Sequence, residues 1–203
     1  MAIINQATKE LQVKIVYYGP GKGGKTTNLE QVHGNVQNVQ EKGKLISLAT
    51  SSDRTLFFDF LPIEAMSIKG FKTKFQLYTV PGQVIYNTTR QLVLRGVDGI
   101  VFVADSQYDK MADNVESFAN LEENLKALKV NLADMPYVLQ YNKRDLPNAA
   151  PVEYMDFLLN NRDVQVPSFA ASATRCDGVF DTLNMITRML LNKFINEGTR
   201  KVA

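Results

Sequence analysis

Short apolar runs alternate along this chain with longer segments in which apolar residues recur every three or four positions. The run at 100–104 is wholly apolar and rich in β-branched residues, which is typical of a central strand in a parallel sheet. Across 69–79, Phe71, Phe75 and Leu77 share one register, as in a half-buried strand. Strands are also predicted over 11–18, 137–141 and 166–170, with further apolar segments at 44–49 and 56–61.

The segments between these strands have the apolar spacing of helices. Residues 111–129 and 179–195 each have one apolar face, which predicts amphipathic helices packed on a sheet. The residues on these faces are Phe118, Leu121, Leu125 and Leu128, and Leu183, Ile186, Leu190 and Phe194. Further helices are predicted over 25–36, 85–95 and 152–160. This alternation predicts an α/β fold, a mostly parallel sheet with helices on both faces, in one domain spanning 1–203.

The turn between the first strand and the first helix has the spacing of a phosphate-binding loop. Residues 19–26 read Gly-Pro-Gly-Lys-Gly-Gly-Lys-Thr, which matches Gly, any four residues, Gly, Lys and Ser or Thr. Backbone N–H groups and the positive helix end would bind phosphate oxygens, Lys25 would reach the β- and γ-phosphates, and the Thr26 hydroxyl would bind Mg²⁺. The alternative is an ordinary glycine-rich turn. The predicted phosphate-binding residues here are Gly19, Gly21, Lys22, Gly23, Gly24, Lys25, Thr26 and Thr27.

A second motif follows the strand at 137–141, where a parallel sheet binds its ligands. Residues 142–145 read Asn-Lys-Arg-Asp, the Asn-Lys-x-Asp pattern of guanine recognition. An ionised Asp145 can accept two hydrogen bonds, from the ring N–H and the 2-amino group of guanine. Adenine offers no such pair of donors. Lys143 would cover one face of the base and Asn142 would join this loop to the phosphate loop, whereas the alternative is a solvated turn.

A third loop follows the last predicted strand. Ser172, Ala173 and Thr174 stand where a further contact with the base is needed. The Ala173 N–H could donate to the guanine carbonyl oxygen, although three polar loop residues are a weak pattern by themselves. We therefore include Ser172, Ala173 and Thr174 with the predicted guanine-binding residues.

Composition narrows the classes of partner. The chain has 203 residues, 45% of them hydrophobic, and a net charge of +2, so charge favours neither nucleic acid nor membrane as the main partner. Cys176 is the single cysteine, which excludes an internal disulfide and favours a reducing, cytoplasmic compartment. Neither terminus carries a signal peptide or lipidation motif, so we expect no direct lipid anchor.

Together these motifs resemble those of Ras-type small GTPases. Within that superfamily, three segments are very similar to the bacterial mutual gliding-motility protein A (MglA) family, and the similarity covers nearly the whole chain. The segments are 17–21, 53–62 and 79–83. The resemblance implies a Ras-like P-loop GTPase fold and a polarity switch that binds GTP or GDP with Mg²⁺ and is slow without an activator. It also implies a monomer that is recruited to a cell pole by partners, namely a roadblock-type activator dimer and polarity-complex effectors.

The resemblance further assigns residues to GTP hydrolysis. Gln83 follows the Pro-Gly turn at 81–82 and would orient the attacking water, while Gly82 would lie at the phosphates. Thr55 resembles the threonine whose hydroxyl completes Mg²⁺ coordination and whose N–H contacts the γ-phosphate. Arg54 matches the family's arginine finger, supplied from its own chain. The implied catalytic residues are Gln83 and Arg54, and the implied metal ligands are Thr26 and Thr55.

Three positions depart from the expected patterns. Thr79 replaces the Asp that holds a Mg²⁺-bound water in most small GTPases, and Asp53 or Asp59 could compensate. Lys22 adds a charge beside the phosphates where the family has Leu, and Ser51 stands where the family has Glu. These departures suggest one alternative, a polarity scaffold that holds nucleotide with little hydrolysis. Another alternative, an ATP-using P-loop kinase, is opposed by the motif at 142–145.

The aromatic segment at 56–61 has apolar residues on both registers. It is either a buried strand or a sheet edge to which a partner adds a strand. In a Ras-like strand order it would lie at the edge of the sheet, so both possibilities remain open at the level of sequence.

Overall fold

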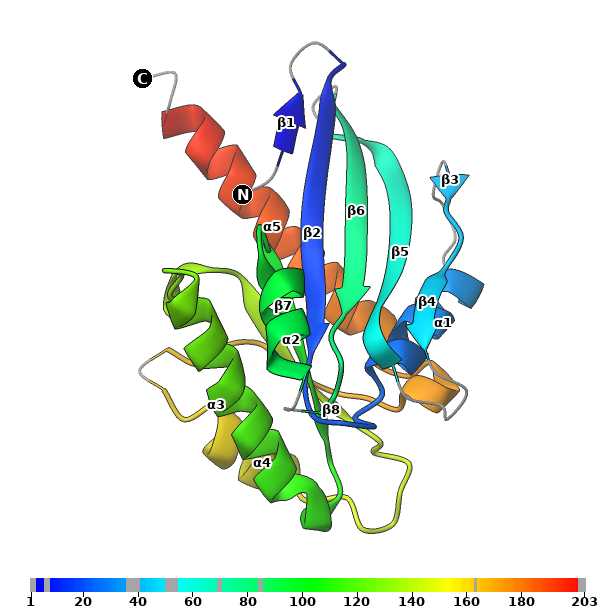
Figure 1. Ribbon diagram of the computed structural model, residues 1–203, viewed down its shortest axis with the longest axis vertical. Helices are drawn as coiled ribbons and strands as arrows, with labels where there is room; N and C mark the ends of the chain where they lie inside the picture. The colour runs from blue at the N-terminus through cyan, green and yellow to red at the C-terminus, as the bar shows by residue number, and fades with distance from the viewer. Residues whose placement is uncertain are drawn as a thin grey trace.

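The central sheet of the computed structural model is built around strand β2 (Glu10–Tyr18) and has the order β3-β5-β6-β2-β7-β8-β9 (Figure 1). The structure describes residues 3–5, 8–35, 41–49, 55–68, 71–83, 86–162 and 164–200. Neighbouring strands along the path β6-β2-β7-β8-β9 are parallel. These strands are β6 (Phe71–Thr79), β7 (Gly99–Asp105), β8 (Tyr137–Asn142) and β9 (Ser168–Ala170).

Beyond β6 the sheet is antiparallel. Strand β5 (Thr55–Ile68) pairs with β6 from Phe60 to Ile68, and its other side pairs with β4 (Ile46–Ala49) and β3 (Glu41–Lys42). Of the two possibilities left open for 56–61, an exposed sheet edge is wrong, because the short strand β4 pairs with this part of β5. A further short strand, β1 (Ile3–Asn5), pairs with β2 and was not predicted.

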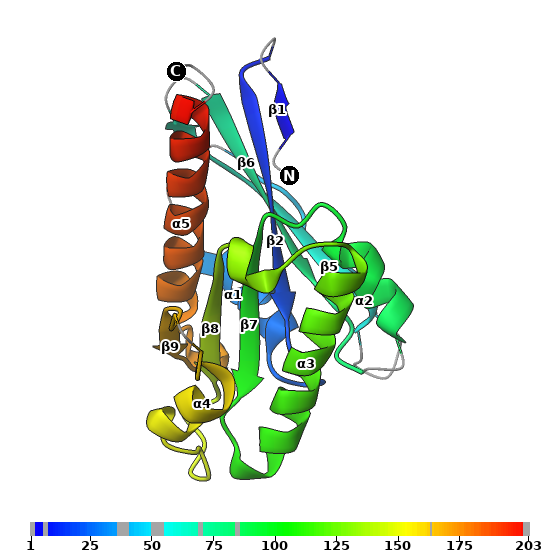
Figure 2. The same cartoon turned by 90° about the vertical axis from the view of Figure 1, so that its left-hand side faces the viewer.

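Helices cover both faces of the sheet, as Figures 1 and 2 show from two directions. Helices α1 (Lys25–Asn35) and α5 (Val179–Arg200) lie on one face. Helices α2 (Asn87–Leu94), α3 (Met111–Ala127) and α4 (Val152–Leu159) lie on the other face. The predicted α/β fold, a mostly parallel sheet between two helical layers, is confirmed. None of the helices within the described residues is long and apolar enough to span a bilayer.

Each helical layer has its own apolar core. Alternate residues of β2 point to opposite layers, so Val16 and Tyr18 pack with α3 while Ile15 and Tyr17 pack with α1 and α5. Strand β7 is buried along its whole length, as its unbroken apolar run predicts. Because these strands are fixed by packing on both faces, the loops after their carboxyl ends start from a rigid base.

The predicted element boundaries differ from the structure by a few residues. Helix α5 extends to Arg200, beyond the predicted end at 195, and β9 begins at Ser168 instead of 166. Pro167 has no N–H to donate to a neighbouring strand, which accounts for the later start. These differences leave the loops after β2, β6, β8 and β9 at the carboxyl ends of parallel strands, where the candidate site lies.

Candidate functional site

The loop from β2 to α1 packs so closely that two of its glycines cannot be replaced. Gly19 has a φ of +143°, and an added Cβ would lie 2.1 Å from the carbonyl oxygen of Val103. Gly24 has a φ of +101°, and its Cβ would lie 2.1 Å from Asn142 Nδ2. The spacing of glycines in this motif therefore follows from contacts with β7 and with the loop after β8.

Lys25 is buried beneath this loop. Its side chain is only 6% exposed, and Nζ donates to the carbonyls of Gly19 (3.1 Å) and Pro20 (2.7 Å). The pKa of Lys25 is lowered to about 7, mainly by burial and also by the nearby Arg90 guanidinium, while the Asp59 carboxylate partly opposes both effects. The buried Arg90 guanidinium and a lysine that an incoming anion would keep protonated thus lie near the buried carboxylate of Asp59, an arrangement that suits an anionic ligand.

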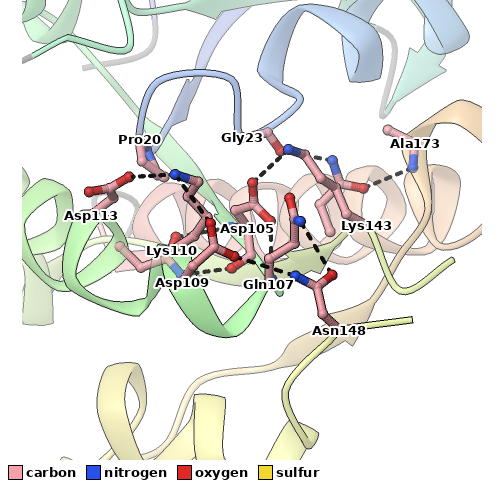
Figure 3. A network of polar contacts seen from close by, with 12 residues as sticks. Pro20, Gly23, Asp105, Gln107, Asp109, Lys110, Asp113, Lys143, Asn148 and Ala173 are labelled. Carbon is pink, nitrogen blue, oxygen red and sulfur yellow. Dashed lines mark hydrogen bonds and ion pairs between the residues drawn. The ribbon is translucent and has the colours of Figure 1, made fainter. Parts of the chain in front are cut away.

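Asn142 joins the three loops that sequence analysis singled out. Its Nδ2 donates to the carbonyl of Gly23 (2.8 Å), and its Oδ1 accepts the Ala173 N–H (2.8 Å). The predicted link between the Asn-Lys-x-Asp loop and the phosphate loop is present. In Figure 3, Gly23 and Ala173 mark the two loops that this side chain connects. The Ala173 N–H is already used by Asn142, so a base carbonyl would have to share it.

The charged residues of the second motif are held in fixed positions. Ser172 Oγ donates to Asp145 Oδ1 (2.7 Å), and this hydrogen bond lowers the pKa of Asp145, which keeps the carboxylate ionised. Lys143 Nζ forms an ion pair with Asp105 Oδ2 (2.6 Å), and Asp105 is 1% exposed (Figure 3). Ser172 Oγ also lies 3.2 Å from Thr174 Oγ1.

A hollow of about 210 Å³ lies between the phosphate loop and the other two loops. Its lining includes most of the residues predicted to bind guanine and part of the phosphate loop. These are Lys22, Gly24, Thr27, Asn142, Lys143, Asp145, Ala173 and Thr174, together with Leu146. The lining combines the Asp145 carboxylate with Lys22 of the phosphate loop, which matches a ligand that has both hydrogen-bond donors and an anionic group.

Asp59 of β5 occupies the region where Thr79 replaces the usual Asp. It is fully buried, and its Oδ2 accepts hydrogen bonds from Thr26 Oγ1 (2.6 Å) and Thr79 Oγ1 (2.8 Å). The Asp59 N–H donates back to Thr79 Oγ1 (2.8 Å). Of the two carboxylates considered as compensation for Thr79, Asp59 therefore reaches the phosphate-loop threonine, and Asp53 lies outside the described residues.

The turn after β6 packs on the phosphate loop. A Cβ added at Gly82 would lie 2.3 Å from Gly21 Cα, so the two backbones are in direct contact. Gln83 follows this turn, is partly exposed, and accepts the Tyr86 N–H through its carbonyl (3.2 Å). Thr55 is the first residue of β5, and only its backbone belongs to the described part of the chain. Arg54 and Ser51 lie outside the described residues.

A model of the Ras family matches residues 14–192. The chain belongs to the Ras family. It is 53% identical over 198 residues to mutual gliding-motility protein MglA of Myxococcus xanthus (strain DK1622), covering 98% of this chain and 100% of that protein. It is also 27% identical over 140 residues to Ras-related protein Rab-13 of Canis lupus familiaris, covering 68% of this chain and 66% of that protein.

Membership of the Ras family makes this protein a small GTPase that binds guanine nucleotides. Sequence analysis missed two buried residues of this Ras-family site. Asp105 could have been found, because it ends a central strand at the carboxyl edge of the sheet where ligands bind. Arg90 lies on the same helix face as Val93 and Leu94, and a charge on an apolar face was the available signal.

The buried lysine predicts a pH dependence of nucleotide affinity in this Ras-family protein. The pKa of Lys25 is about 7 in the free protein, and a bound phosphate must raise it, so binding takes up a proton above pH 7. Affinity for GDP should therefore fall as pH rises from 7.5 to 9, by up to about tenfold per pH unit. The phosphates of GDP lose their last proton near pH 6, so they contribute little in this range.

Titration calorimetry at pH 8 in two buffers of different ionisation enthalpy measures this proton uptake, which should approach one per GDP. Lys22 lines the hollow but is exposed, so Lys22→Met should weaken binding without removing the pH slope. A dissociation constant that stays constant between pH 7.5 and 9 would contradict a neutral Lys25 in the free protein.

Proposed function

We propose that this GTPase is a Mg²⁺-dependent switch that cycles between GTP and GDP and controls cell polarity or gliding motility. The observation that carries the nucleotide assignment is the Asn142 side chain, which ties the phosphate loop to both loops predicted to bind the base. A switch needs these loops to respond as a unit to one ligand, and a single buried amide between them supports that role.

Guanine specificity is assigned to Asp145, with Lys143 covering the base and Ser172, Ala173 and Thr174 completing the pocket. The Ser172 hydroxyl holds the ionised carboxylate of Asp145 at the hollow, where it can accept from two guanine donors. The ion pair with Asp105 fixes the Lys143 stem beside the same hollow. An adenine ring would leave the Asp145 carboxylate without donors, which disfavours the ATP-using kinase alternative.

Phosphate binding is assigned to the glycines of 19–24, with Lys22, Lys25, Thr26 and Thr27, and to Gly82 after β6. The buried Arg90 guanidinium, together with a buried lysine that a bound phosphate would protonate, supports an anionic ligand at this position. On nucleotide binding, Lys25 Nζ would donate to phosphate oxygens instead of to the carbonyls of Gly19 and Pro20. Charged oxygens compensate the desolvation of the ammonium group better than neutral carbonyls do.

The residues around Thr26 fit a magnesium ion. Mg²⁺ binds hard oxygen ligands, and here a hydroxyl and a buried carboxylate lie 2.6 Å apart beside the phosphate loop. Bound Mg²⁺ would neutralise charge on the β- and γ-phosphates. Thr26 and Thr55 would hold the ion directly, and Asp59 would take the position that Thr79 leaves without a carboxylate. A carboxylate at Asp59 therefore weakens the argument, based on Thr79, for a scaffold that holds nucleotide with little hydrolysis.

Hydrolysis is assigned to Gln83, which would orient water, and to Arg54, which would stabilise charge on the transferring oxygens. Phosphoryl transfer depends mainly on position and charge, so removal of one orienting hydrogen bond should lower the rate without lowering affinity. Gln83→Ala should therefore slow single-turnover hydrolysis about tenfold, the equivalent of ~1.4 kcal/mol, with GTP affinity within about twofold of wild type.

The measurement is phosphate release from pre-bound GTP with Mg²⁺, with Arg54→Ala tested in parallel and Lys44→Ala as an exposed control. Hydrolysis by the wild type that depends on both Gln83 and Arg54 would support the assignment. A wild type that binds GTP and turns over no faster than either variant would leave nucleotide binding intact and reject these two catalytic roles.

The cellular role rests on the relationship to a named gliding-motility protein that aligns over 98% of this chain. From it we propose a single domain spanning 1–203, monomeric alone, in the cytoplasm and recruited to a cell pole by partners. The proposed partners are a roadblock-type activator dimer and polarity-complex effectors, with no nucleic acid. Since β4 and β3 cover β5, partners would contact these short strands or the turn after β6.

A further inference from the structure

Arg90 of helix α2 is fully buried, although its guanidinium is always charged. Its helix position places it on the face that carries Val93 and Leu94, between β2 and α3. Within the residues that the structure describes, no ion pair between Arg90 and a carboxylate is formed. The charge is instead satisfied by neutral acceptors, which makes this arginine different from an ordinary surface side chain.

The guanidinium binds two consecutive backbone carbonyls of the turn after β6. Nε donates to the carbonyl of Pro81 (2.9 Å), and a terminal nitrogen donates to the carbonyl of Gly82 (2.6 Å). The other terminal nitrogen donates to Asn120 Oδ1 (2.7 Å) and to the Tyr18 hydroxyl (3.3 Å). The turn is thus fastened through one side chain to the ends of β2 and to α3.

This fork fixes the orientation of the peptide groups on either side of Gly82. In a planar trans peptide the N–H points away from the carbonyl of the same group. With both carbonyls turned to Arg90, the N–H groups of Gly82 and Gln83 point away from it. Gly82 is in backbone contact with Gly21 of the phosphate loop, so the orientation of this turn bears directly on the phosphate site.

The amide residues around Arg90 extend the connection into both helices. Asn124 Nδ2 donates to the Tyr18 hydroxyl (3.0 Å) and to Asn87 Oδ1 (2.7 Å), and Asn120 Nδ2 donates to Asn87 Oδ1 (3.1 Å). The cluster therefore joins β2, α2 and α3 through buried and partly buried hydrogen bonds, and any movement of α2 must move the turn or break them.

Fold stability alone does not account for this arrangement. Desolvating a guanidinium costs several kcal/mol, and an apolar side chain of similar volume is often equally stabilising at a buried site. Buried charges that local packing does not need are expected where function requires a fixed geometry. Here the geometry that is fixed belongs to the residues immediately before the proposed water-orienting Gln83.

We propose that Arg90 is a positioning residue for GTP hydrolysis, which holds the Pro81–Gly82 turn so that the N–H groups of Gly82 and Gln83 face the γ-phosphate. This inference rests on the proposed function of Gln83 and the phosphate loop. Arg90 does not contact the nucleotide in this role. Arg90 positions the turn that contacts the nucleotide. Loss of Arg90 should therefore reduce GTP affinity and GTP hydrolysis more than GDP affinity.

The test is Arg90→Met, which keeps an unbranched buried side chain but removes all the donors. We expect GDP affinity within about twofold of wild type, GTP affinity relative to GDP lowered about fivefold, and single-turnover hydrolysis slowed about tenfold, as for one lost orienting interaction. Arg90→Lys keeps the charge without the two-pronged fork and should recover little of the rate. Arg95→Met, at an exposed arginine just after α2, is the matched control.

Hydrolysis by Arg90→Met at the wild-type rate would overturn the proposal, as would an equal loss of GTP and GDP affinity with a lower melting temperature. If Arg90→Met fails to fold, Asn120→Ala removes one anchor of the guanidinium and should lower the GTP to GDP affinity ratio in the same direction. An unchanged ratio in that variant would also reject the proposal. A wild type that does not hydrolyse GTP would instead reject the underlying function.

Discussion

Asp145→Asn is expected to lower the affinity for GTP by about 10⁴-fold and to make the protein prefer xanthosine triphosphate. In the proposed site the carboxylate of Asp145 would accept from the ring N–H and from the 2-amino group of guanine, whereas an amide presents one acceptor and one donor. Xanthine has a carbonyl in place of the 2-amino group, so it matches the amide. The change keeps side-chain volume, so its effect reports hydrogen-bond complementarity.

Competition against a fluorescent guanine nucleotide measures both affinities in one titration. Ser172→Ala is the matched control, because it removes the hydroxyl that orients Asp145 but keeps the carboxylate. It should weaken GTP and GDP binding only about tenfold, the lower end of the value of one hydrogen bond to a charged group, without favouring xanthine. Tight GTP binding by Asp145→Asn would show that the base is recognised elsewhere.

The parallel core of the fold could be predicted because its signals are local. The apolar run at 100–104 and the alternation of Phe75 and Leu77 each identify one strand without reference to the rest of the chain. The phosphate loop and the Asn142 loop follow such strands, so parallel topology alone brings them together. That is why the contact between Asn142 and Gly23 could be expected from sequence.

The antiparallel half was harder to predict, since its pairing depends on contacts distant in sequence. The apolar residues on both registers of 56–61 fit either a buried strand or a sheet edge, and they do not indicate that β4 and β3 cover β5, because strand order is a property of the whole sheet. The position of the Asp59 carboxylate could not be predicted for the same reason. Its neighbours in sequence are aromatic, and only the pairing of β5 with β6 brings its carboxylate to Thr79 and Thr26.

Arg90 could not be assigned from sequence for a related reason. An arginine on the apolar face of a helix is usually expected to extend its charged group to solvent. Burial of the guanidinium depends on acceptors from three separate elements, the turn after β6, β2 and α3. The role of such a residue is visible only once several elements are packed around its side chain. In this protein that packing holds a turn beside the proposed phosphate site.

Asp59→Asn is expected to reduce the affinity for Mg²⁺ in the nucleotide complex by about 100-fold, the scale seen when a group that orients a metal ligand is lost. The amide keeps the shape of a side chain that is fully buried and hydrogen-bonded to Thr26 and Thr79, so the fold should persist. The Mg²⁺ dependence of GDP release, followed with a fluorescent nucleotide, measures this loss.

The neighbouring strand offers a direct rescue of that variant. Thr79 faces Asp59 across the β5–β6 pair, with its hydroxyl 2.8 Å from the Asp59 N–H. Thr79→Asp in the Asp59→Asn background moves the carboxylate to the position that most small GTPases use, and should restore at least half of the lost Mg²⁺ affinity on a logarithmic scale. Thr79→Asp alone should perturb the site, because two buried carboxylates side by side repel. If the double variant binds Mg²⁺ no better than Asp59→Asn, the two positions are not interchangeable, and Asp59 acts by holding Thr26 in place instead of by supplying charge to the metal.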